Sequence, residues 1–180
     1  MTRFIAFLRA INVGGHRVKM EHLRTLFEEL GFINVETFIS SGNVIFDFLP
    51  KDVKALEKNI ESHLHKMLGY EVATFIRTTN QVIAISQYKP FSDFELTENI
   101  ALNVAFLCDP LKEEAKIALM KFKTEIDDFH TQNQEVYWLC RKKQSDSTFS
   151  NTSFERRLNI KTTFRGISTI RKLAAKYSDC

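Results

Sequence analysis

The residues best suited to bind a ligand lie in a basic loop that runs from Arg9 to Lys19. Two adjacent glycines in this loop let a ligand approach the backbone closely. Backbone N–H groups at the start of a helix, together with nearby cations, suit an anion such as phosphate. The predicted ligand-binding residues are Arg9, Asn12, Gly14, Gly15, His16, Arg17, Ser41, Gly42 and Asn43.

The segment 41–43 belongs to this set because a predicted sheet brings it beside the loop. Its Ser-Gly-Asn sequence is typical of a tight turn between two strands. In a βαββαβ unit the third strand lies antiparallel beside the first, so the loop leaving the first strand meets the turn entering the third. The alternative interpretation is structural: the glycines permit a turn, Asn12 and Ser41 bond the loop, and Arg9 forms an ion pair. Eleven loop residues exceed a simple βα connection, which favours binding.

A second candidate cluster consists of Lys142, Lys143, Thr163 and Arg165. From residue 141 to 176 the chain carries ten Lys and Arg against two Asp and Glu, whereas from 91 to 140 it carries four against ten. A basic face attracts anions. Charge runs are equally typical of solvent-exposed faces, and the sequence does not separate the two interpretations.

Several kinds of catalytic and metal site are not predicted. The sequence has no Walker loop, no Gly-rich dinucleotide fingerprint, no nucleophile elbow and no zincin motif. Cys108, Cys140 and Cys180 are odd in number and widely spaced, which argues against a disulfide framework and a thiolate metal site. Cys108 is expected to be a small buried residue at a strand end. We therefore predict no metal and no cofactor, and we name no catalytic residue.

Apolar periodicity and turn residues predict the same order of elements twice along the chain. The first half is predicted to hold strands at 3–9, 34–39, 44–48 and 72–77, and helices at 20–30 and 53–67. The second half is predicted to hold strands at 100–107, 125–129, 136–141 and 161–164. One of its helices should open at Asp109 and Pro110, and the other at a capping box formed by Thr152 and Glu155.

This order predicts an α+β protein, a tandem duplication of a ferredoxin-like βαββαβ unit with an added C-terminal helix. We expect subdomain 1 at residues 1–79, a connecting helix and loop at 80–98, and subdomain 2 with the C-terminal helix at 99–180. The strands are apolar on both sides, as the run 4–8 illustrates. Both faces of each sheet are therefore expected to be covered.

The N-terminal third carries the most specific pattern. It consists of residues 7–20, 23–24, 31–32, 35, 37–39 and 41–46. With this pattern the chain resembles a bacterial family, domain of unknown function 1697, and the resemblance extends over nearly the whole chain. It implies a duplicated ferredoxin-like fold and supplies no activity. Members end in a Thr-x-Arg-Asn-Trp-x-Thr signature, of which this chain keeps Thr163, Arg165 and Thr169 but has Gly166 and Ile167 in place of the Asn and the aromatic residue.

Length and composition indicate a globular protein of one large or two small domains, with 180 residues, 44% of them hydrophobic, and a net charge of +3. No apolar run approaches the ~18 residues that a membrane span needs. The apolar run at 4–8 is followed by no cleavage site, so it is interpreted as a strand and not as a signal peptide. We therefore expect a cytoplasmic protein with no membrane partner.

These features lead to one preferred hypothesis and two alternatives. We predict a non-enzymatic module that binds a phosphate-bearing small molecule at the loop 9–19. The alternatives are an enzyme acting on a phosphorylated small molecule and a protein-interaction or oligomerisation module. Nucleic acid is less favoured, because residues 41–48 keep only the glycine and the final aromatic residue of the RNA-recognition strand motif. The sequence does not specify the ligand, a protein partner or the packing of the two halves.

Overall fold

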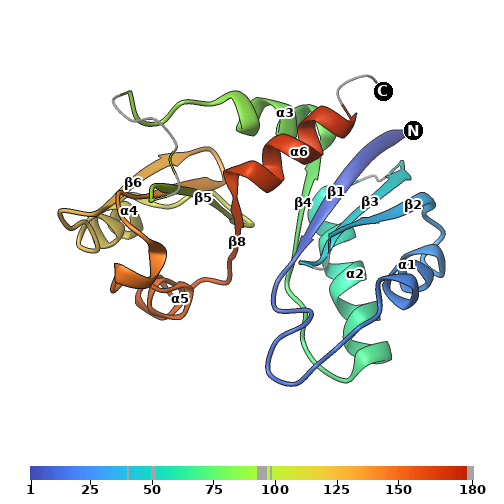
Figure 1. Ribbon diagram of the computed structural model, residues 1–180. Helices are drawn as coiled ribbons and strands as arrows, with labels where there is room; N and C mark the ends of the chain where they lie inside the picture. Colours follow the sequence, from blue (N-terminus) through green and yellow to red (C-terminus); the bar gives the residue numbers. More distant parts are fainter. Residues whose placement is uncertain (40, 50–51, 93–96, 98, 178–180) are drawn as a thin grey trace. The chain divides into compact units, whose positions relative to one another are not determined.

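The computed structural model describes residues 1–39, 41–49, 52–92, 97 and 99–177, so Cys180 and part of the segment 80–98 lie outside the described residues. The first half forms β1 (Thr2–Leu8), α1 (Met20–Glu28), β2 (Ile33–Phe38), β3 (Asn43–Phe48), α2 (Val53–Leu68) and β4 (Thr74–Thr78) (Figure 1). After α3 (Thr79–Gln87) come β5 (Ala101–Phe106), α4 (Glu113–Met120), β6 (Asp127–Gln132), β7 (Glu135–Cys140), α5 (Asn151–Leu158), β8 (Thr163–Gly166) and α6 (Ile167–Tyr177). Within the described part of the chain, no helix has the length and apolar character that crossing a membrane requires.

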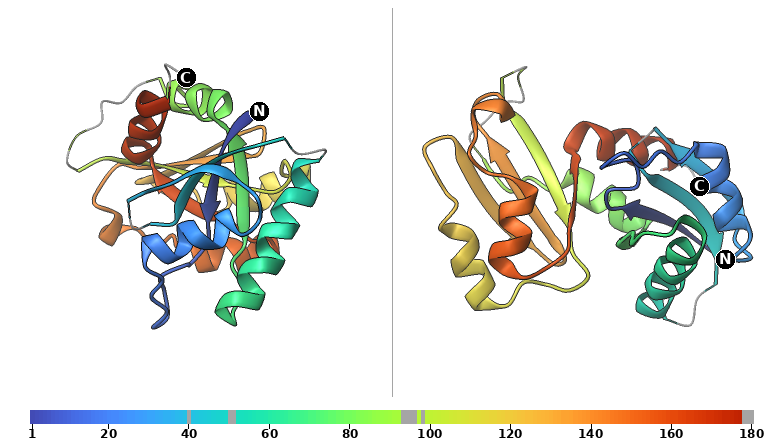
Figure 2. Two further views of the ribbon diagram at one scale, coloured as in Figure 1. Left: turned by 90° about the vertical axis from the view of Figure 1, so that its right-hand side faces the viewer. Right: turned by 90° about the horizontal axis from the view of Figure 1, so that it is seen from below.

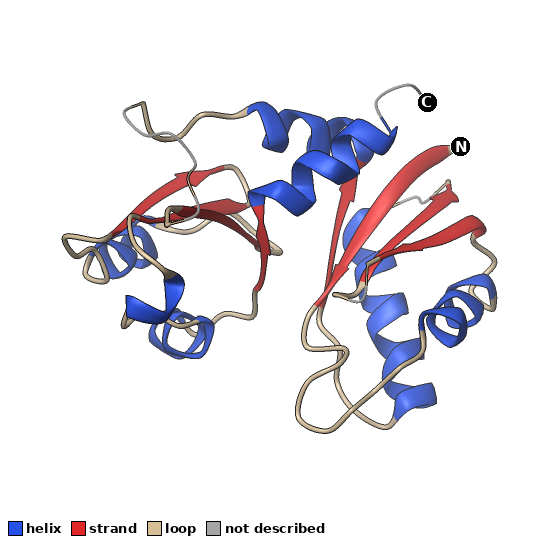
Figure 3. Cartoon of the chain, viewed as in Figure 1, coloured by secondary structure: helices blue, strands red, loops and turns tan. Residues whose placement is uncertain are grey.

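The chain divides into two compact units. Unit 1 comprises Met1–Ala84 and Leu173–Cys180, and unit 2 comprises Ile85–Lys172. Each unit holds a four-stranded antiparallel sheet, with strand order β2-β3-β1-β4 in unit 1 and β6-β7-β5-β8 in unit 2 (Figure 3). The predicted fold class is confirmed: the protein is α+β, in two similar halves that are consistent with tandem duplicated βαββαβ units.

In unit 1, the helices α1 and α2 cover one face of the sheet (Figures 1 and 2). Successive residues of a strand point to opposite faces. Phe4, Ala6 and Leu8 of β1 point to the helices and pack with their apolar stripes. Ile5 and Phe7 point to the other face and are fully buried as well. The strand is thus apolar on both sides because both sides are buried, as the sequence predicts.

The last turn of α6 lies on this second face of unit 1. The Lys176 ammonium lies 2.7 Å from Glu36, and the Tyr177 hydroxyl donates to the same carboxylate over 3.1 Å. Arg3 pairs with Glu36 and with Asp47, and its guanidinium lies 4.9 Å from the centre of the Tyr177 ring. The hydrogen bond from Lys176 is the main cause that lowers the pKa of Glu36. Charged groups therefore hold the C-terminal turn against β2.

Carboxylates of α2 complete the hydrogen bonding of β4, which is an end strand of its sheet. Glu61 accepts a hydrogen bond from the backbone N–H of Thr74, and Glu57 accepts one from Ile76, each over 2.8 Å. A buried N–H without a partner costs about 1–3 kcal/mol. The two glutamates remove this cost, and they also block the edge against pairing with another strand.

In unit 2, a carboxylate of α5 likewise accepts a backbone hydrogen bond beside β8. The N-cap predicted for α5, Thr152, was wrong. The cap is Ser150, whose hydroxyl accepts from the backbone N–H of Ser153 over 3.1 Å, so the helix begins before Thr152. The Glu155 carboxylate accepts from the buried backbone N–H of Thr162 over 2.8 Å, just before β8. The sequence motif alone cannot reveal this competing acceptor role.

The start of α4 was also predicted wrongly. The pair Asp109–Pro110 suits a helix start, yet α4 begins at Glu113, and its N-cap residue Lys112 makes no side-chain cap bond. Leu111 is only 8% exposed and packs into the core of unit 2. The chain therefore carries Leu111 into the core before the helix begins.

Replacing Glu57 with Gln should change how stability depends on pH. Burial raises the pKa of Glu57, because it disfavours the charged carboxylate. The folded protein then binds this proton more tightly than the unfolded chain, so its stability falls as the pH rises past the ordinary Glu value of about 4.3. Gln keeps an oxygen for the Ile76 N–H and never ionises. We expect the unfolding free energy of Glu57→Gln, measured in urea relative to that of wild type, to increase from pH 4 to pH 8. A difference in unfolding free energy that does not change with pH would contradict a raised pKa.

Replacing Glu155 with Ala should expose the β8 edge locally. The Thr162 N–H loses its acceptor, and we expect a destabilisation of about 1–3 kcal/mol together with faster hydrogen exchange at Thr162. Glu155→Gln is the matched control, because its side-chain oxygen still accepts the bond. Equal exchange rates at Thr162 in the two variants would show that this carboxylate does not protect the strand.

Candidate functional site

The loop that joins β1 to α1, residues 9–19, starts at a fixed point on the sheet. The backbone N–H of Leu8 donates to Gly42 and that of Arg9 donates to Ala73, each over 2.8 Å. Phe7 lies opposite Asn43 in the β1–β3 register. The structure therefore brings the turn 41–43 to the start of the loop, as the predicted strand order requires.

Two side chains hold the loop in shape. The Asn12 side-chain oxygen accepts from the backbone N–H of Val18 over 2.7 Å, which closes the tip formed by residues 13–17. The Tyr70 hydroxyl donates to the carbonyl of Ile11 over 2.9 Å. The ring of His16 stacks on Tyr70, with 3.8 Å between ring centres and 19° between planes. Burial raises the pKa of Tyr70, so its hydroxyl keeps the donated proton.

Tyr70 is the member of this site that sequence analysis missed. It follows α2 and lies 59 positions from Ile11, so no local pattern connects it to the loop. An aromatic residue next to the helix-ending Gly69 looks like an ordinary helix end. Only the folded chain shows that it supports His16.

The tip of the loop faces solvent. Gly14 and Gly15 have φ of 67° and 88°, a region that favours glycine, and no atom lies within 4 Å of where a Cβ would stand on either residue. His16 and Arg17 are exposed beside them. The loop thus offers backbone N–H groups, an imidazole and cations, and its eleven residues include no carboxylate, hydroxyl or thiol. This chemistry suits an anion.

The polar side chains of the turn 41–43 serve the hairpin itself. Asn43 is fully buried, and its amide nitrogen donates to the Phe38 carbonyl over 3.0 Å and to the Ser41 hydroxyl over 2.8 Å. Gly42 lies so close to the loop that a Cβ there would stand 2.6 Å from a methyl carbon of Ile11. These residues position the loop, and a direct role for them in binding stays a prediction.

Arg165, of the second predicted cluster, is buried inside unit 2. It is 8% exposed, and its guanidinium donates to the Thr163 hydroxyl over 2.8 Å and to the Phe164 carbonyl over 2.9 Å. Burial lowers the pKa of Arg165 to about 10, so the side chain stays charged at neutral pH. These contacts with neighbours of its own strand are structural, and a role for Arg165 in binding stays a prediction.

The structure does not bring the two lysines of that cluster to Arg165. Lys142 and Lys143 are exposed and follow the end of β7, where their carbonyls accept from the Cys140 thiol at 3.1 and 3.8 Å. The Arg165 side chain reaches instead toward Thr163, which lies level with the start of β7. The cluster therefore separates into a buried and an exposed part at opposite ends of the strand. Among the described residues, no group of three or more His, Cys, Asp and Glu could hold a metal ion.

The contact between Gly42 and Ile11 can be tested against a glycine of the loop tip. Gly42→Ala combines a φ of 75° with a methyl group 2.6 Å from Ile11, and we expect it to lower the unfolding free energy by about 3 kcal/mol. Gly15→Ala has a similar φ of 88° in open space and should cost about 1 kcal/mol. Urea unfolding of both variants measures the difference. Equal losses would show that the turn does not press on the loop.

Comparison with known proteins supports the fold and assigns a family. A conserved bacterial protein from Streptococcus pneumoniae has a similar solved structure, with a TM-score of 0.72 and 20% sequence identity over 99% of each chain. At this identity the likeness shows the fold alone. Comparison with curated protein sequences gave no match. The family model for proteins of unknown function, DUF1697, matches residues 1–137, which include both loop and turn, and the chain therefore belongs to the DUF1697 family.

Proposed function

We propose that this protein is a non-enzymatic binding module that takes a phosphate-bearing ligand at the tip of the loop 9–19. The observation that carries the proposal is the stack of His16 on Tyr70, beside two exposed glycines. A stacked ring next to an accessible backbone forms a binding surface that already has its shape in the free protein. A ligand with a phosphate group and a flat or polar body would meet both.

The charge of the loop favours an anion. Arg9, Arg17 and Lys19 contribute three positive charges, and no acidic residue lies between them. A ligand with two negative charges is attracted more strongly than one with a single charge, and salt should weaken the attraction.

The fixed shape of the loop supports binding by a preformed site. A free loop of eleven residues would lose much conformational entropy when a ligand orders it. The bonds from Asn12 to Val18 and from Tyr70 to Ile11 already restrict the tip. Folding therefore already accounts for most of the conformational entropy that the loop would otherwise lose when a ligand binds.

The chemistry of the loop favours binding over catalysis. Covalent catalysis needs an activated hydroxyl, thiol, amine or carboxylate, and general acid–base catalysis usually pairs a titrating group with an orienting partner. His16 is the single histidine of the loop, and its ring is stacked on Tyr70. We therefore favour a binding module over an enzyme acting on the same ligands.

We also infer that the two units descend from one ferredoxin-like unit and that the protein works in a bacterial cytoplasm. Arg77 of β4 lies opposite Ile5 of β1, and Arg165 of β8 lies opposite Val104 of β5. Both arginines are buried, and each donates to the carbonyl of the preceding residue. A shared detail of this kind supports duplication. The three widely spaced cysteines suit a reducing compartment.

The test is titration calorimetry with inorganic phosphate, a nucleotide and a sugar phosphate at low salt. We expect at least one phosphate compound to bind, and Arg17→Ala to weaken it about tenfold, as loss of a hydrogen bond to a charged group predicts. Arg24→Ala is the matched control, because Arg24 is an exposed arginine on α1 that pairs with Glu28 outside the loop. The affinity should also fall as salt is added.

Two results would contradict the proposal. The first is that none of the three phosphate compounds binds the wild-type protein. The second is binding that Arg17→Ala and Arg24→Ala weaken to the same extent, because the site would then not be the loop tip. Turnover of a bound phosphate compound would move the function to the enzyme alternative.

A further inference from the structure

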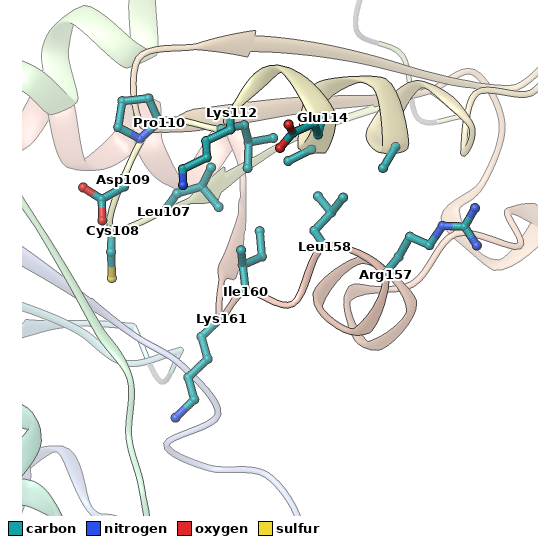
Figure 4. Close-up of a pocket in the computed structure, with 13 residues that line it drawn as sticks. Leu107, Cys108, Asp109, Pro110, Lys112, Glu114, Arg157, Leu158, Ile160 and Lys161 are labelled. Atoms are coloured by element: carbon teal, nitrogen blue, oxygen red, sulfur yellow. The ribbon is translucent and has the colours of Figure 1, made fainter.

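A pocket of about 560 Å³ opens in unit 2 between α4 and α5 (Figure 4). Its floor is formed where β5 ends, and its walls are the facing sides of the two helices and the segment that leads to β8. The volume lies in the range of small-molecule sites, about 300–1,000 Å³. The lining residues are Leu107, Cys108, Asp109, Pro110, Leu111, Lys112, Glu114, Ala115, Ala118, Arg157, Leu158, Ile160 and Lys161.

The interior of the pocket is aliphatic. Leu107 and Leu111 form the buried part, at 3% and 8% exposure. Leu158 and Ile160 point toward α4 from the α5 side in Figure 4. Ala118 lines the α4 side with a methyl group alone, and this small side chain leaves room between the helices. An alkyl chain would be transferred from water into such a space favourably.

Cations lie at the rim. In Figure 4, Lys112 lies at the Cys108 end of the pocket, Lys161 extends outward below Ile160, and Arg157 lies at the far end of the pocket. Neither Lys112 nor Arg157 forms an ion pair with another described residue. Long basic side chains can lay their apolar stems along an aliphatic surface and present their charge to an anion at its edge. The rim holds three cations and two acids, so its net charge favours an anionic group.

We propose that this pocket binds a single-chain amphiphile, with its alkyl chain between α4 and α5 and a carboxylate or phosphate head beside Lys112, at a rim to which Lys161 adds positive charge. This site lies in unit 2 and is separate from the loop 9–19, so it does not depend on the function proposed for that loop. The aliphatic interior excludes a purely polar metabolite as a good fit. The pocket volume of about 560 Å³ suits one chain better than a helix of a partner protein, which is about 10 Å wide with its side chains.

Cys108 provides a direct readout of occupancy. The sequence predicted a buried residue here, but Cys108 is exposed and lines the pocket. Cys140 is buried, and burial raises the pKa of its thiol. A polar alkylating reagent should therefore modify Cys108 first, because the thiolate is the reactive form. Cys180→Ser removes the third thiol. The rate of alkylation of Cys108, followed by mass spectrometry with added hexanoate, octanoate, decanoate, octyl phosphate, octanol or octylamine, measures binding.

We expect hexanoate, octanoate and decanoate to slow the alkylation of Cys108 at progressively lower concentrations. Each buried methylene should strengthen binding roughly fourfold until the pocket is filled. Octanoate or octyl phosphate should bind about tenfold more tightly than octanol, and octylamine should bind more weakly still. The tighter of the two anions identifies the head group. This series uses no variant of the pocket, so it decides the question even where a variant folds poorly.

Two pairs of variants locate the site. Ala118→Leu fills the α4 side and should abolish protection by octanoate, whereas Ile117→Leu, one position along at a residue that is 62% exposed, should not change it. Lys112→Gln combined with Lys161→Gln should weaken octanoate about tenfold and leave octanol unchanged. Lys116→Gln is the control on α4, since Lys116 pairs with Glu113 outside the lining. Arg17→Ala in unit 1 should leave protection by octanoate intact.

The proposal is overturned if chain length has no effect, or if octanoate, octanol and octylamine protect Cys108 equally. It is also overturned if folded Ala118→Leu binds octanoate as wild type does. An amphipathic peptide that protects Cys108 where no alkyl anion does would assign the pocket to a partner helix instead. If the wild-type protein binds octanoate but no phosphate compound, the function proposed for the loop 9–19 is rejected and the proposal for the pocket is retained.

Discussion

The structure depends on how the outer edges of β4 and β8 are satisfied. Each is an end strand, and its outward N–H groups would otherwise lie beside a packed core without partners. Helix carboxylates supply the acceptors: Glu57 and Glu61 on β4, and Glu155 before β8. These bonds also fix the angle and depth at which α2 and α5 lie on their sheets, because a helix shifted by one turn would lose them. In this fold the same helix positions must therefore both pack the core and place carboxylates against the backbone N–H groups of the edge strands.

This requirement leaves little of either sheet free for function. One face of each sheet packs against two helices, and residues of the opposite face, such as Ile5 and Phe7, are buried too. The buried arginines Arg77 and Arg165 lie on that opposite face, where a desolvated charge is costly and must be bonded. Their donation to neighbouring carbonyls meets part of that demand. Chemistry that can vary without disturbing the cores is thus confined to the loops that follow the strands.

Sequence patterns predicted the order of the elements correctly, because strand alternation and helix stripes are local signals. The same patterns failed where a contact with a distant residue determines the role of a side chain or the start of a helix. Glu155 looks like half of a capping box, yet its carboxylate accepts a hydrogen bond from the backbone N–H of Thr162. Asp109 looks like a helix cap, yet burial of Leu111 delays the helix. The loop was predictable from its glycines and cations, whereas Tyr70, which supports it, came from another element with no signal of its own.

The two units also show how one frame carries two different loops after its first strand. The backbone N–H of Leu8 donates to Gly42 over 2.8 Å, and that of Leu107 donates to Gln134 over 2.9 Å, the same bond at the same point of each sheet. Beyond it the chain takes residues 9–19 to reach α1 but only 107–112 to reach α4. The long loop needs its own polar cross-links and presents a basic tip. The short loop leaves the flanks of α4 and α5 uncovered, and that uncovered space is the pocket. Because the edge bonds stabilise each sheet independently of these loops, loop length alone can determine whether a unit presents charge or an apolar cavity.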